Sequence, residues 1–116
     1  MNIKIELHSH SSASDGVLSP SVLIDLAHTR AIRVLALTDH DTTQGVLEAK
    51  KRAAKYNITL IPGIELSTVY KGETVHILGY FKDNSYMSKE FQLYLQELQE
   101  YRIFRVKKII ENLKLY

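Results

Sequence analysis

Two histidines near the N-terminus begin the part of the chain best suited to chemistry. His8 and His10 follow an alternating apolar run, residues 3–7, which predicts a β-strand. Residues two apart on a strand share a face, so both imidazoles can converge on one point beyond its end. Asp15 adds a carboxylate after a Ser-rich loop, and Gly16 allows a sharp turn there. The pattern predicts the start of a first-row metal site, and a pair of surface histidines is the alternative.

Three further polar side chains are predicted at ends of later strands. His40 follows the apolar run 33–37, Glu65 follows a third run, and His76 lies in a predicted hairpin. Taken singly, Glu65 could be an exposed strand residue and His76 could pair with a neighbouring strand. Because the carboxyl ends of parallel strands meet at one edge of a sheet, the joint pattern favours convergence. Asp39 is interpreted as a supporting residue or a partner of a backbone N–H, and Asp41 as a helix cap.

Two short helices are predicted between the first strands. Ser19 is a good N-cap and Pro20 a good first residue for a helix that extends to about residues 30–32. His28 lies within it and is interpreted as a surface or packing residue. The second helix is expected over about residues 43–56, with Asp41 or Thr42 as its cap.

The remaining apolar runs predict an α/β fold. A third strand at 58–61 continues through 64–67, and a hairpin joins 66–70 to 74–81 through a turn centred on Gly72. The order β-α-β-α-β followed by a hairpin predicts a mainly parallel sheet with right-handed crossovers.

The last segment of the chain predicts one long amphipathic helix from about residue 88 to the end. Apolar residues recur there every three or four positions, and nearly thirty residues correspond to about 40 Å. Arg102 and Arg105 lie near the apolar stripe, where we expect their stems to pack with the charged heads free. A helix of this length cannot bury its whole stripe within so short a chain, which favours a partner chain or a missing part of the same domain.

Composition limits the function classes. The chain has 116 residues, 45% of them hydrophobic, and a formal net charge of +2, which is too small to indicate a surface that coats nucleic acid. The absence of cysteine excludes disulfides, thiolate catalysis and cysteine-based zinc sites. No signal peptide and no apolar run of membrane-spanning length are recognisable, so we expect a soluble, cytoplasmic protein without a membrane partner.

The motifs together resemble the N-terminal part of a PHP (polymerase and histidinol phosphatase) domain. The resemblance rests on His8-Ser9-His10 with Ser14-Asp15-Gly16, on Thr38-Asp39-His40-Asp41, on Pro62-Gly63-Ile64-Glu65 and on His76-Ile77-Leu78-Gly79-Tyr80. Their order and spacing are most similar to the stand-alone bacterial branch, which acts on nucleoside 3′,5′-bisphosphates or on the 5′ ends of short RNAs.

The resemblance implies a metal-dependent phosphoesterase. The family fold is a distorted (β/α)₇ barrel with up to three divalent ions, Mn²⁺, Zn²⁺ or Fe²⁺, at the strand ends. A metal-bound hydroxide would attack phosphorus, and no protein nucleophile is required. His8 and His10 would hold one metal, and Glu65 would bridge it to a second metal. His76 would complete the site of that second metal. Asp15 and His40 would bind a further metal. The implied ligands are His8, His10, Asp15, His40, Glu65 and His76.

The resemblance also implies how the chain is organised. Residues 1–82 would be a partial metal-binding PHP domain, and residues 83–116 the start of a helical insertion. A complete stand-alone member is more than twice as long, so we expect a fragment whose remaining ligands and substrate-binding arginines lie elsewhere. The expected substrate is a phosphorylated small molecule or a short oligonucleotide.

Two alternative functions remain open from the sequence. One is a non-catalytic module that self-associates through the long helix and the open sheet edge. The other is a proofreading exonuclease domain of a DNA polymerase. The helical segment after the hairpin fits the stand-alone branch better than it fits this alternative.

Overall fold

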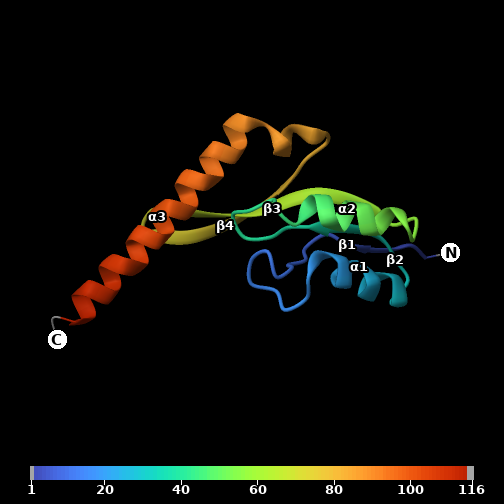
Figure 1. Ribbon diagram of the computed structural model, residues 1–116, viewed down its shortest axis with the longest axis horizontal. Helices are drawn as coiled ribbons and strands as arrows, with labels where there is room; N and C mark the ends of the chain where they lie inside the picture. Colours follow the sequence, from blue (N-terminus) through green and yellow to red (C-terminus); the bar gives the residue numbers. More distant parts are fainter. Residues whose placement is uncertain (1, 115–116) are drawn as a thin grey trace.

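A four-stranded mixed sheet forms the centre of the computed structural model, which describes residues 2–114 (Figure 1). The strands follow one another in the sheet as β1–β2–β3–β4, and β4 alone runs antiparallel to its neighbour. The elements are β1 (Lys4–Glu6), α1 (Pro20–Thr29), β2 (Ile32–Leu37), α2 (Val46–Ala54), β3 (Thr59–Tyr70), β4 (Glu73–Tyr80), the 3₁₀-helix η1 (Asn84–Met87) and α3 (Lys89–Lys114). The predicted order of strands and helices is confirmed.

Helices α1 and α2 pack against each other and against the sheet. Leu35 and Leu37 lie two residues apart on β2, so they share a face, and they form one buried cluster with Ile24 of α1 and Val46 of α2. Burying side chains of this size contributes about 1.5–3 kcal/mol each. This core fixes the position of the β2 end from which the site is built.

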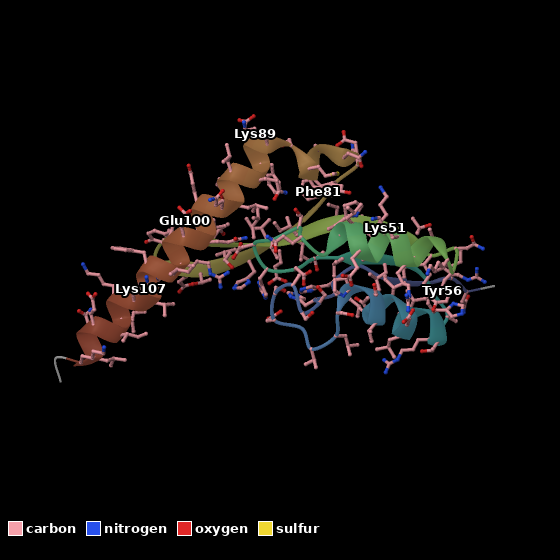
Figure 2. The ribbon with its side chains drawn as sticks, viewed as in Figure 1. Lys51, Tyr56, Phe81, Lys89, Glu100 and Lys107 are labelled. Carbon is pink, nitrogen blue, oxygen red and sulfur yellow. The ribbon has the colours of Figure 1, made fainter. Side chains whose placement is uncertain are left out.

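A polar cluster also joins the two helices. Arg52 of α2 donates two hydrogen bonds, of 2.7 and 2.8 Å, to the carboxylate of Asp25 on α1, and the Tyr56 hydroxyl donates a third of 2.7 Å. The bonds from Arg52 and then Tyr56 lower the pKa of Asp25 to about 2. His28 stacks on the Tyr56 ring, with centroids 4.1 Å apart. Figure 2 places Tyr56 at the opposite end of the molecule from Lys107 of α3.

The starts of the two helices differ in how well the sequence predicted them. Helix α1 begins at Pro20, and the Ser19 hydroxyl accepts a hydrogen bond from the Val22 N–H as expected of an N-cap. Helix α2 begins only at Val46, so its predicted start at residue 43 is wrong, as is its predicted capping by Asp41 or Thr42. The Thr42 hydroxyl instead accepts from the Gln44 N–H, and such local bonds compete with helix formation.

Strand β3 is a single strand of 12 residues and crosses Pro62 without interruption. Residues 59–62 pair with β2 and residues 63–70 pair with β4, and a parallel bridge between His40 and Glu65 continues the pairing beyond the end of β2. The hairpin turn has positive φ at both central residues, 50° at Lys71 and 81° at Gly72, as in a type I′ turn. Glu65 therefore lies between His40, which follows β2, and the hairpin strand β4.

Helix α3 spans 26 residues, about 39 Å at 1.5 Å per residue, and projects past the sheet (Figure 1). Leu95 is its buried residue, and residues 101–114 are all exposed. The predicted unburied stripe is confirmed, whereas the division of the chain at residue 82 stays a prediction. Among the described residues, no helix combines the length and apolar character needed to cross a membrane.

Candidate metal centre

The segment that carries His8 and His10 is held beside the end of β2. The Ser9 hydroxyl donates to the Ala36 carbonyl at 2.6 Å, and the Thr38 N–H donates to the Ser9 carbonyl at 2.9 Å. The Ser9 N–H in turn donates to the Thr38 hydroxyl at 3.2 Å. These bonds continue the parallel alignment beyond β1 and bring both imidazoles to the carboxyl end of the sheet.

Asp39 anchors the loop that follows. Its buried carboxylate accepts hydrogen bonds from the Ser11 N–H at 2.6 Å, the Ser11 hydroxyl at 2.8 Å and the Ser14 hydroxyl at 2.7 Å. Gly16 lies so close to the backbone that an added Cβ would be 2.7 Å from the carbonyl carbon of His10. Close approach, rather than the turn expected from the sequence, is therefore what requires glycine at this position. The packed loop presents Asp15 towards the histidines.

Glu65 lies at the centre of the polar cluster. Its Oε1 lies 2.5 Å from His8 Nε2 and 3.2 Å from His10 Nε2, and its Oε2 lies 2.7 Å from His76 Nδ1 and 3.4 Å from His40 Nδ1. The residue is only 6% exposed, so the alternative of an ordinary exposed strand residue is wrong. One carboxylate thus contacts four of the five histidines in the chain.

Asp15 closes the other side of the cluster. Its Oδ1 lies 2.8 Å from His10 Nδ1 and its Oδ2 lies 3.3 Å from His40 Nε2. The contact with His10 lacks hydrogen-bond geometry in spite of the short distance, and this buried nitrogen has no hydrogen-bond partner within residues 2–114. A buried nitrogen beside a carboxylate oxygen without a hydrogen bond is the arrangement expected of two ligand atoms that face a common cation.

The donor set fits divalent transition metals. Ligand atoms about 2.1 Å from one ion lie about 3 Å apart, and the contacts of this cluster have that spacing. Nitrogen and carboxylate oxygen without sulfur suit Zn²⁺, Mn²⁺ or Fe²⁺. The structure brings all six predicted residues together, although their role as ligands stays a prediction. Three groups have donor atoms within 4.8 Å of one another: His8, His10 and Glu65; His10, Asp15 and His40; and His40, Glu65 and His76.

The sharing of histidines between these groups limits how many ions they can hold. A neutral imidazole offers one lone-pair nitrogen, because its other nitrogen carries the proton. His10 and His40 can therefore each serve only one of the two groups to which they belong. If the first and third groups each held one ion, Glu65 would belong to both sites, and Asp15 would remain as a single donor for another ion. A third complete site would need ligands from outside the described residues.

The pKa values of the two carboxyl groups, Glu65 and Asp15, favour cation binding. Burial raises the pKa of Glu65, but hydrogen bonds with His76 and His8 and the charges of His40 and His10 outweigh it, so the pKa lies below its usual value. Desolvation likewise raises the pKa of Asp15, and the nearby charges of His10 and His40 bring it below its usual value. Both groups are thus ionised at neutral pH, as metal binding requires.

Arg102 of α3 reaches the same edge, which the sequence did not predict. Its Nη1 donates to Asp41 Oδ2 at 2.6 Å, so the expectation of a free charged head is wrong for this residue. The only signal in the sequence was its position near the apolar stripe of a helix. It lines a hollow of about 360 Å³ together with Ser14, Asp15, His40, Ser67 and His76.

Comparison with protein families agrees with this geometry. The family model described as PHP domain matches residues 6–112. The chain belongs to the PHP family. Its sheet and helices form the N-terminal part of a PHP barrel. Of the predicted site residues, Glu65 lies within β3 and His76 within the antiparallel strand β4, rather than at strand ends.

Curated relatives include enzymes that act on nucleotides and RNA. The chain is 46% identical over 86 residues to a 5′-3′ exoribonuclease of Haemophilus influenzae. The alignment covers 74% of this chain and 31% of the relative. It is 49% identical over 75 residues to a 3′,5′-nucleoside bisphosphate phosphatase of Chromobacterium violaceum, with 65% and 26% covered. The chain therefore spans about a quarter to a third of the length of these PHP relatives.

Solved structures show the same fold. A Chromobacterium violaceum structure, described as an amidohydrolase with bound sulfate and no metal, matches with a TM-score of 0.82 and 40% identity over 90% of this chain and 36% of that one. A candidate metal-dependent phosphoesterase of Bifidobacterium adolescentis matches with a TM-score of 0.83 and 26% identity, with 98% and 39% covered. The second match spans almost the whole chain, so the structural similarity includes α3.

Proposed function

We propose that this chain contributes a metal-binding part of a phosphoesterase that hydrolyses phosphate esters of nucleotides or of short RNA ends. The observation that carries the proposal is the convergence of four histidines and two carboxylates, His8, His10, Asp15, His40, Glu65 and His76, beside a hollow that Arg102 lines. The activities printed for the curated relatives support the choice of substrate.

In this proposal, one set of residues binds cations and another binds the phosphate group. The six donors would hold divalent ions, and bound ions of this kind supply Lewis acidity and lower the pKa of water towards neutrality. The guanidinium of Arg102 presents N–H donors that match phosphate oxygens. The hydroxyls of Ser14 and Ser67 line the same hollow and can donate to an ester or phosphate oxygen. No covalent protein intermediate is needed.

His40→Ala tests the proposal, and His28→Ala is its matched control. Phosphate release from adenosine 3′,5′-bisphosphate in the presence of Mn²⁺ should fall about 100-fold or more in His40→Ala, because metal stabilisation of the transition state is worth several kcal/mol. His28 stacks on Tyr56, outside the polar cluster, so its replacement should leave the rate unchanged. Undiminished release in His40→Ala would contradict the proposal.

Self-association is a second candidate function, favoured by the second half of α3. The apolar side chains exposed there are Ile103, Phe104, Val106, Ile109, Ile110 and Leu113. Apolar side chains exposed over several turns of one helix are typical of interaction sites. If it joins two copies, light scattering should give twice the 13.3 kDa mass of one chain, and Phe104→Ser with Ile110→Ser should restore the single mass. A monomer of unmodified protein at high concentration would exclude this candidate.

A further inference from the structure

Asp41 has an unusual backbone for a residue next to the metal centre. It follows His40, is fully buried and has a φ of 54°, in the left-handed region. That region is strained for an L-residue, although aspartate and asparagine tolerate it better than most. Such a conformation persists only where the surrounding structure fixes it. The contacts of Asp41 therefore indicate what it holds in place.

Every polar group of Asp41 is used, and the partners come from two elements. On the β3 side, its Oδ1 accepts from the Ser67 N–H at 2.9 Å and its N–H donates to the Glu65 carbonyl at 3.1 Å. On the α3 side, its Oδ2 accepts from Arg102 Nη1 at 2.6 Å and its carbonyl accepts from Gln99 Nε2 at 2.8 Å. Asp41 thus cross-links the strand that carries Glu65 to the long helix.

The cross-link lies where α3 leaves the rest of the molecule. Towards the start of the helix, Leu95 is buried and Gln92 Nε2 donates to the Thr43 hydroxyl at 2.8 Å. After Arg102, the described part of the helix has no hydrogen bond or ion pair with another element, and its residues are exposed. Figure 1 shows this part projecting beyond the sheet. Asp41 provides the last polar attachment of α3 as far as residue 114.

We infer that Asp41 is a positioning residue, which seats α3 against β3 and thereby holds the Arg102 guanidinium at the mouth of the hollow, ready for a phosphate group. The phosphate in this inference rests on the proposed function, whereas the seating of α3 does not. A guanidinium has five N–H donors, and Asp41 uses one of them. Arg102 can therefore keep its bond to Asp41 while its other donors bind an anion.

Asp41→Asn isolates the charge of the side chain. Asparagine has the same shape, tolerates the left-handed region and keeps an oxygen that can accept from the Ser67 N–H, so the local backbone should persist. Arg102→Gln removes the other half of the ion pair. Arg105→Gln is the matched control, because Arg105 is exposed one turn further along α3 and has no polar partner among the residues that the structure describes.

The first measurement follows the position of α3 by double electron–electron resonance. Since the chain has no cysteine, Lys51→Cys on α2 and Lys107→Cys on α3 give two unique, exposed positions for spin labels (Figure 2). The parent and Arg105→Gln should give one narrow distance distribution. Asp41→Asn and Arg102→Gln should each broaden it, and the double variant should be no broader than either. A distribution in Asp41→Asn as narrow as that of the parent would overturn the inference.

The second measurement follows the position of the guanidinium, with inorganic phosphate as the probe in calorimetry of the Mn²⁺-loaded chain. Asp41→Asn should raise the Kd of phosphate about tenfold, as expected for losing one charge-assisted hydrogen bond. Its metal content should match that of the parent, because the six donors are untouched. Unchanged phosphate affinity, or a parallel loss of metal, would overturn the positioning role. If the parent binds no phosphate while the spin labels respond, the seating by Asp41 stands and the proposed function fails.

Discussion

Glu65→Gln should remove metal from the protein more completely than any other single substitution in the chain. The carboxylate contacts four histidines and belongs to two of the three groups of candidate ligands. Glutamine keeps the shape but has no charge and only one acceptor oxygen, so it cannot bridge two cations. Because the loss of a mere outer partner costs about 10–100-fold in metal affinity, we expect a loss of more than about 100-fold here. Elemental mass spectrometry of protein purified without chelator measures it.

Two further proteins make this result interpretable. Glu73→Gln changes an exposed carboxylate at the start of β4, near the hairpin tip, and should keep the metal content of the parent. The double variant His8→Ala with His10→Ala removes one candidate group entirely and should also lose metal. Equal metal content in Glu65→Gln and in the parent would show that the cluster is not a metal centre.

Local sequence patterns were sufficient for much of the fold. The Ser19-Pro20 start of α1 depends only on neighbouring residues, and so does the turn at Gly72. The convergence of His8 and His10 followed from the two-residue period of a strand. Each of these features is set within a few residues along the chain, which is why it could be predicted without knowing the rest.

The features that the sequence missed depend on contacts between distant segments. The Asp41 carboxylate is bound to Ser67 and Arg102, which lie 26 and 61 residues away, and so does not cap α2. The burial of Glu65 likewise depends on the loop and hairpin histidines that surround it. The periodicity of α3 placed Arg102 near an apolar stripe. No pattern of neighbouring residues could show that Arg102 contacts Asp41 beside the polar cluster.

Asp39→Ala should cause the largest loss of stability among substitutions in and beside the polar cluster. The carboxylate is 1% exposed and accepts three hydrogen bonds, two of them from the fully buried Ser11. Alanine would leave these donors unpaired, and each buried unpaired donor costs about 1–3 kcal/mol. We therefore expect a decrease of about 3 kcal/mol or more in the free energy of unfolding, which corresponds to about 10 °C or more in Tm. Thermal unfolding followed by circular dichroism, with chelator present, measures the protein alone.

The comparison with Asp39→Asn separates hydrogen bonding from charge. Asparagine retains one oxygen for the Ser11 N–H, and serine hydroxyls can rotate to accept from its amide, so we expect a loss of about 1 kcal/mol. Glu97→Ala, at an exposed position of α3, should change stability by less than about 0.5 kcal/mol. Equal losses in Asp39→Ala and Asp39→Asn would mean that the charge of Asp39, and not the pairing of buried donors, stabilises the loop. Since that loop carries His10 and Asp15, Asp39→Ala should also weaken metal binding under conditions in which the variant remains folded.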